Sequence, residues 1–93
     1  MTIQLQIPPR VAAGIGCDPG LRIDDAKSLR EMRGSVAHQW PALAGRLWAD
    51  DGGSRPQIRW FVNGIDSRYL HQMDTRLFDG DLVVVIPETL WDE

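Results

Sequence analysis

The side chains able to act as nucleophiles, proton carriers or metal ligands are few and far apart in this sequence. There is one cysteine, Cys17, and there are two histidines, His38 and His71. A zinc site needs several cysteine or histidine ligands, and covalent catalysis needs a nucleophile beside a base. The spacing offers no such set. We therefore expect no catalytic residue, no metal site and no cofactor, and we expect Cys17 to be a buried or half-buried thiol.

Acidic pairs are the other candidates for chemistry. They occur at Asp24-Asp25, Asp50-Asp51 and Asp92-Glu93. The first pair precedes a helical pattern, the second lies beside two glycines, and the third lies in the C-terminal segment. A helix cap, a solvated loop and a solvated end account for them. No glycine-rich phosphate-binding motif is present, so the chain is not expected to be an enzyme.

Composition limits the remaining function classes. The 93 residues fit one domain, and the net charge is −3, from 10 Lys and Arg against 13 Asp and Glu. Nucleic-acid binders rely on a basic surface. The longest apolar run, residues 82–86, is far too short to cross a membrane. With one cysteine and no signal-peptide pattern, we expect a cytoplasmic protein that binds neither nucleic acid nor membranes.

Three stretches have the patterns of strands. "TIQLQI" at the start alternates apolar and polar residues, and "LRID" at 21–24 is a short second strand that we expect to pair with it in antiparallel fashion. Residues 10–20 between them, rich in glycine and proline, are expected to form a long connection. "QIRWFVNG" is the third strand, rich in residues that strands favour, and it ends in the tight-turn pair Asn63-Gly64.

One long amphipathic helix is expected between the second and third strands. Asp24 and Asp25 are placed to cap its first turn. Pro41 is expected to end or kink it, with one more helical turn after the kink. Apolar residues recur in steps of three and four and predict the buried face of the helix: Ala26, Leu29, Met32, Val36, Ala37 and Trp40.

The last strand is expected at the centre of the sheet. "LVVVI" is unbroken rather than alternating, which is typical of a strand buried on both faces. Asp79-Gly80 before it predicts a turn, and Pro87 closes it. One long helix packed on a small mixed sheet is an α+β arrangement. We assign residues 1–87 to this domain and residues 88–93 to a C-terminal tail.

The sequence resembles the MoaD/ThiS family of ubiquitin-like, β-grasp sulfur carriers. The likeness rests on "TIQLQI", "DDAKSLREM", "FVNG" and above all "DTRLFDGDLVVVIP", and it extends from Thr2 to Pro87. It implies a β-grasp fold with a mixed sheet of four to five strands, one main helix, and a last strand parallel to the first. "FDGD" and "VNG" also have a purely structural reading as turns, because glycine accepts positive φ and aspartate bonds nearby amides.

The tail departs from the pattern of the family it resembles. Carriers in that family end in Gly-Gly, whose carboxylate is adenylated and converted to a thiocarboxylate. Here no glycine follows Gly80, and the tail places Leu90 and Trp91 where carriers have glycine. The pair Gly52-Gly53 lies in a loop that precedes two strands of the fold. We therefore expect this chain not to carry sulfur in the usual way.

Aromatic residues beside arginine suggest where a partner docks. Trp60 shares a strand face with Ile58 and Val62, so Arg59 and Phe61 are expected on the opposite face of the sheet. Aromatic residues and arginine are common interface anchors. An alternative is that the segment around Tyr69 covers Phe61. The candidate partner-binding residues are Arg59, Phe61, Leu90, Trp91 and Glu93.

Three functions remain open. The first is a protein-binding module that keeps the docking face of a carrier and uses its tail as an anchor. The second is a sulfur carrier for molybdopterin, thiamine or a related product, with an atypical tail chemistry. The third is a small subunit that stabilises or regulates an enzyme complex. The partners implied are an activating-enzyme-like protein, a synthase-like protein or a catalytic subunit.

Overall fold

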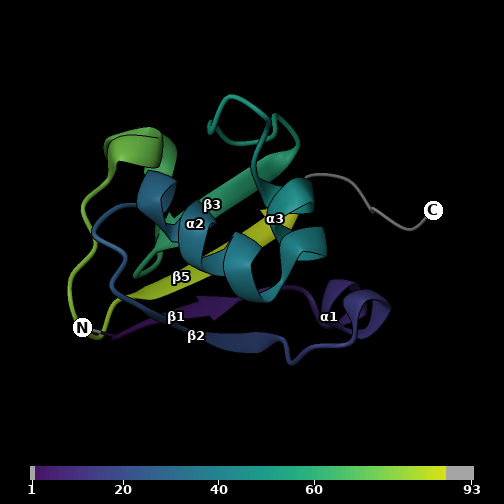
Figure 1. The fold of residues 1–93 in the computed structure, drawn as a ribbon. Helices are drawn as coiled ribbons and strands as arrows, with labels where there is room; N and C mark the ends of the chain where they lie inside the picture. Colours follow the sequence, from purple (N-terminus) through teal and green to yellow (C-terminus); the bar gives the residue numbers. More distant parts are fainter. Residues whose placement is uncertain (1, 88–93) are drawn as a thin grey trace.

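The computed structural model describes residues 2–87, and the predicted tail at 88–93 lies outside this range. Five strands form one sheet in the order β2-β1-β5-β3-β4. Figure 1 shows helices α2 and α3 in front of the sheet. The strands are β1 (Thr2–Gln6), β2 (Gly20–Asp24), β3 (Ile58–Val62), β4 (Ile65–Asp66) and β5 (Leu82–Pro87). The helices are α1 (Pro9–Ile15), α2 (Leu29–Gln39) and α3 (Pro41–Leu47), with 3-10 turns η1 (Ser67–Tyr69) and η2 (Gln72–Asp74).

Strand pairing confirms the predicted β-grasp arrangement. β1 pairs antiparallel with β2 and parallel with β5. β5 also pairs antiparallel with β3, so it lies at the centre of the sheet. The chain thus builds two antiparallel pairs, β1–β2 and β3–β4, and joins them through its last strand (Figure 1). A mixed sheet with its helices gathered on one face is the α+β architecture.

The core lies between the helices and one face of the sheet. Ile3 and Leu5 from β1, with Val83 and Val85 from β5, are almost fully buried. Trp48 and Trp60 pack against each other with ring centroids 4.9 Å apart. Large aromatic side chains contribute much of the apolar area that a small domain can bury. These two tryptophans therefore fill the part of the core next to the 49–57 loop.

The connection between β1 and β2 differs from the prediction. Residues 9–15, expected to be part of a long connection, form helix α1. The helix has Pro9 in its first turn, and Gly16 caps its C-terminal end in the left-handed conformation (φ 76°). Proline at the start and glycine after the end are favourable helix boundaries. The residues between β1 and β2 therefore fold into two turns of helix with Val11 and Ala12 buried.

The long helix begins later than predicted. Ser28, not Asp24 or Asp25, caps α2, because its side-chain oxygen accepts a hydrogen bond from the Glu31 amide at 3.1 Å. Asp24 belongs to β2, and Asp25 adopts a positive φ of 64°. Ala37, predicted on the apolar face, is exposed. The break at Pro41 is confirmed, and α3 continues from there with Leu43, Ala44 and Leu47 buried.

The prediction that β5 is buried on both faces is wrong. Val83 and Val85 face the helices, whereas Val84 is half-buried and Ile86 is 46% exposed on the other side. Its central position requires pairing at both edges but not cover on both faces. In residues 2–87 no helix covers the second face of the sheet (Figure 1). This open face carries the residues described next.

Candidate protein-docking surface

The open face of the sheet has an apolar half and a polar half. Residues paired across neighbouring strands project on the same side. Phe61 pairs with Val84, and Arg59 pairs with Ile86, so these four side chains share the open face. We call them the outer patch: Arg59, Phe61, Val84 and Ile86.

The polar half of the open face covers β1 and β2. Gln6 pairs with Val84 and so adjoins the outer patch directly. Gln4 and Arg22 are also exposed there, and they line a shallow depression of about 330 Å³. An apolar centre beside polar, solvated groups is the usual organisation of a protein interface.

Arg59 is held in place from two sides. Its guanidinium lies 5.4 Å from the centre of the Phe61 ring, a distance at which the cation and the ring attract each other. Its Nη2 also donates to Asp66 Oδ2 at 2.9 Å. The prediction that Arg59 and Phe61 project together from the second face is confirmed. Tyr69, at the centre of the segment that the alternative places over Phe61, is itself 78% exposed.

Asp66 is the charged group that fixes this arrangement. It is 7% exposed, and its Oδ1 accepts the Arg68 amide at 3.0 Å while Arg59 and Arg68 guanidinium groups approach Oδ2. The Arg68 amide above all, followed by Arg59 and the charge of Arg68, lowers the pKa of Asp66 in spite of its burial. The carboxylate thus stays charged and holds Arg59 beside Phe61.

The two turn motifs of the sequence are bonded to each other. Asn63 Nδ2 donates to Asp81 Oδ1 at 3.0 Å, and the Leu82 amide donates to Asn63 Oδ1 at 3.0 Å. Asp81 Oδ2 accepts the Phe78 amide, and Asp79 Oδ1 accepts the amide of Thr2. "VNG" and "FDGD" therefore join three strands at one end of the sheet, which supports their structural reading.

The isolated candidates for chemistry stay isolated in the structure. His38 and His71 are exposed at different helix ends. Cys17 is half-buried, and burial first, then the charge of Asp18, raises the pKa of its thiol. A raised pKa disfavours the reactive thiolate. Among residues 2–87, no three metal-ligating side chains come together, and no helix is long and apolar enough to cross a membrane.

Sequence reasoning found half of the outer patch. It named Arg59 and Phe61 but assigned Val84 and Ile86 to a strand with no exposed side. A signal was available: only one long helix was expected, and one helix layer can cover only one face of a sheet. Leu90, Trp91 and Glu93 lie outside the described residues, so their predicted roles stay predictions.

Comparison with known proteins agrees with this geometry. The chain is 36% identical over 66 residues to "Small archaeal modifier protein 3" of Haloferax volcanii, which covers 71% of each chain. No family model matches the sequence. A chain of the Amycolatopsis orientalis BexX/CysO complex superposes with a TM-score of 0.83 over 95% of this chain and 97% of its own, at 18% identity. The solution structure of a Haloferax volcanii protein gives 0.74 at 29% identity, over 98% and 86%.

The fold and these similarities define a β-grasp protein of the ubiquitin-like class. Within that class the chain belongs to the family of small modifier and sulfur carrier proteins, as its similarity to the archaeal modifier shows. The structural neighbours below 25% identity support the fold alone.

Proposed function

We propose that this protein is a ubiquitin-fold binding module that docks on a protein partner through the outer patch and residues 88–93. One observation carries the proposal. The outer patch ends at Ile86, one residue before Pro87, so the exposed apolar surface and the start of the tail are continuous. In this proposal the same partner binds Leu90 and Trp91, which follow Ile86 by four and five residues in the sequence.

The residue types after Pro87 are a second support for a binding role. Residues 88–93 include a leucine and a tryptophan, two large apolar side chains that follow the outer patch closely in the sequence. Buried tryptophan is a frequent energetic centre of protein interfaces. In this proposal the partner is a cytoplasmic protein of the activating-enzyme or synthase kind or a catalytic subunit, and the chain itself is not an enzyme.

Charge placed on the outer patch tests the docking. Ile86→Glu is expected to weaken binding to the physiological partner by at least about tenfold, because a carboxylate would be buried in an apolar contact. Ile65→Glu is the matched control, since Ile65 is 51% exposed and lies outside the patch. Both variants should melt close to the parent. Equal binding by the two variants would exclude the patch as the docking surface.

A sulfur carrier with atypical tail chemistry is the second candidate, because membership of the modifier and carrier family favours it. Intact mass spectrometry after incubation with ATP, a sulfur donor and the activating enzyme of the native cell separates the two. If the protein is a binding module, its mass is expected to stay unchanged. A gain equal to the exchange of one oxygen for sulfur would establish the carrier.

A further inference from the structure

A second surface lies at the edge of the sheet formed by β3. β4 pairs only with Phe61 and Val62. Residues 58–60 of β3 therefore have no strand beside them on that edge within residues 2–87. An unpaired strand edge is a template for the addition of another strand.

The backbone of Trp60 points toward this edge. The Asn63 amide donates to the Leu82 carbonyl of β5 at 2.8 Å. Backbone groups alternate in direction along an antiparallel strand, so Phe61 and Arg59 also direct their amides to β5. Trp60, between them, directs its N–H and C=O to the opposite edge. One residue of an added strand can pair with both groups.

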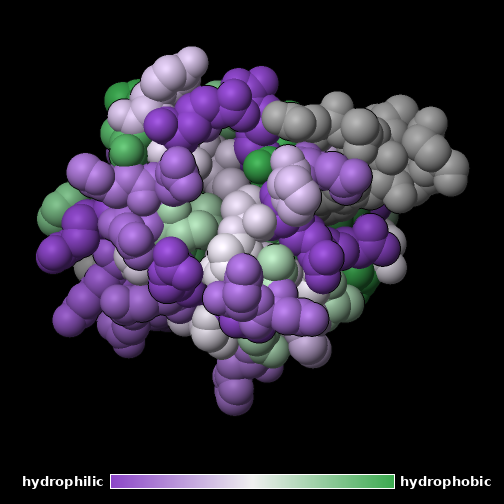
Figure 2. Space-filling model, turned by 90° about the horizontal axis from the view of Figure 1, so that it is seen from above, coloured by the Kyte–Doolittle hydropathy of each residue, from purple (hydrophilic) through white to green (hydrophobic). Residues whose placement is uncertain are grey.

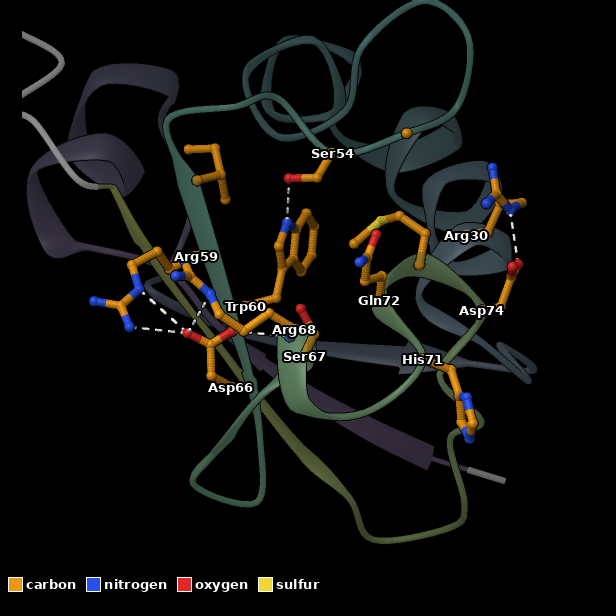
Figure 3. Close-up of a pocket in the computed structure, with 13 residues that line it drawn as sticks. Arg30, Ser54, Arg59, Trp60, Asp66, Ser67, Arg68, His71, Gln72 and Asp74 are labelled. Carbon is orange, nitrogen blue, oxygen red and sulfur yellow. Dashed lines mark hydrogen bonds and ion pairs between the residues drawn. The ribbon is translucent and has the colours of Figure 1, made fainter.

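A cleft of about 340 Å³ lies along this edge, within the size range of ligand pockets. Ile58, Trp60 and Met73, all buried, supply its apolar surface. Figure 3 shows Ser54 above the Trp60 indole and Gln72 facing the indole across the cleft. The indole Nε1 donates to Ser54 Oγ at 2.7 Å, which fixes the ring as one wall.

Arginine–aspartate ion pairs lie on both sides of the cleft, with two arginines for one aspartate on one side. Arg59 and Arg68 lie on one side with Asp66, and Arg30 lies on the other with Asp74 (Figure 3). Viewed from above in Figure 2, hydrophilic groups dominate the surface, and apolar atoms show only as small separate spots.

Arg33 is a further cation close to Gly52, in the loop between α3 and β3. A β-carbon placed on Gly52 would lie 3.6 Å from Arg33 Nη1 and 3.7 Å from Arg30 Nη1, so both guanidinium groups flank this glycine. Among residues 2–87 no carboxylate lies within ion-pair distance of Arg33. Four arginines and three aspartates (Asp51, Asp66 and Asp74) thus lie around this edge, in a protein whose net charge is −3.

We propose that this edge cleft binds an extended acidic segment of a partner protein, which adds as a short strand along residues 58–60. Trp60 would supply the backbone hydrogen bonds, and the apolar wall would take one apolar side chain. Arg30, Arg33 and Arg68 would meet the flanking carboxylates. Strand addition gives affinity through the main chain, while side-chain contacts give specificity. This edge shares Arg59 with the outer patch, but Arg30, Arg33 and Arg68 lie outside the patch, so the inference does not depend on the proposed docking there.

A synthetic peptide tests the charge requirement. The probe is fluorescein-labelled Asp-Glu-Val-Leu-Glu-Asp, and the matched control replaces each acid by its amide. Fluorescence anisotropy with the full chain should show the acidic peptide binding at least about tenfold more tightly, with affinity falling as salt rises. Equal affinity of the two peptides, or no binding of either, would overturn the proposal.

Variants of two arginines distinguish binding at the cleft from a general response to the charge of the protein. Arg33→Gln should weaken binding of the acidic peptide by at least about fivefold, because a charged contact is lost. Arg22→Gln should leave it unchanged, since Arg22 lies at the far edge of the sheet on β2. The same loss in both variants would show only a response to net charge and would contradict the site.

The backbone amide of Trp60 can be used to test whether the bound peptide adds as a strand. Binding should slow hydrogen exchange of the Trp60 amide and shift its NMR signal. A thymidine hexanucleotide is the nucleic-acid probe. If it binds and loses affinity in Arg33→Gln as the peptide does, the site binds nucleic acid rather than an acidic peptide, and the proposal is refuted. Markedly tighter peptide binding by a chain ending at Pro87 would show that residues 88–93 occupy the cleft, which also contradicts it.

Discussion

Asp66 shows how one residue connects the fold to the outer patch. It is nearly buried, yet its pKa is lowered, since the Arg68 amide and two guanidinium groups stabilise the charged form more than burial opposes it. The sequence did not single out Asp66 among 13 acidic residues. Its importance depends on contacts with Arg59 and Arg68, which the pairing of β4 with β3 brings together.

Asp66→Asn should lower the free energy of unfolding by about 1–3 kcal/mol at neutral pH, because the amide leaves buried donors poorly satisfied. A lowered pKa stabilises the fold above the unfolded value of about 4, and this contribution disappears as pH falls through the folded pKa. Urea unfolding of the parent and the variant should therefore differ at pH 7 and converge in acid. A constant difference at all pH values would exclude the carboxylate charge as the cause.

The positive φ of Gly80 predicts how a side chain at this position would change the stability of the protein. It has a φ of 86° in the turn before β5, and a β-carbon there would meet no atom within 4 Å. The cost of a side chain therefore comes from the backbone alone. Gly80→Val should destabilise the protein by about 1–3 kcal/mol. Gly34→Ala, also in open space but inside α2, should instead stabilise it by about 0.5–1 kcal/mol. Thermal melts of the two variants should shift in opposite directions.

At the scale of elements, α2 illustrates what a sequence pattern leaves open. Asp24, Asp25 and Ser28 are all residues that cap helices. Pairing of β2 with β1 extends through Asp24, and Asp25 makes the bend with its positive φ. Only Ser28 remains to cap the helix. Competition between a strand partner and a cap is settled by contacts distant in sequence, so the start of α2 could not be predicted from local pattern.

Ser28→Ala should lower the free energy of unfolding by about 1 kcal/mol, because the Glu31 amide loses its side-chain acceptor. Asp25→Asn is the control, since asparagine also tolerates positive φ, and it should leave stability nearly unchanged. Chemical denaturation gives both values. A larger loss of stability from Asp25→Asn than from Ser28→Ala would show that Asp25 caps the helix, as the sequence first predicted.

The positions of the strands along the chain could be predicted because their signals are strong and local, whereas the parallel pairing of β5 with β1 was implied by the family resemblance. Alternation in β1, the Asn63-Gly64 turn and the Asp79-Gly80 turn each match the structure. α1 was missed because its glycines and prolines lie at or near its ends as well as inside it. The exposed side of β5 was missed because valine and isoleucine look the same on covered and open faces. Nothing in the local sequence marks which side the helices take.

At the scale of the whole molecule, the tail is predicted to serve binding rather than folding. Within residues 2–87, side chains from β1, β2, α2, α3, β3 and β5 form one buried core cluster. A chain ending at Pro87 should therefore melt within a few degrees of the parent. It should bind the physiological partner at least about tenfold more weakly, as expected for loss of a tryptophan anchor. A large fall in melting temperature with unchanged binding would show that Trp91 belongs to the core.

The central position of β5 also determines when this protein can fold during its synthesis. β1 is made first, but its parallel neighbour is made last, and only β5 joins the β1–β2 pair to the β3–β4 pair. Contacts between distant parts of a chain form slowly. Until residue 87 has left the ribosome, Leu5 and Trp60 lack the strand that pairs beside them. A nascent chain held at its C-terminus should stay sensitive to protease until a spacer frees its last strand.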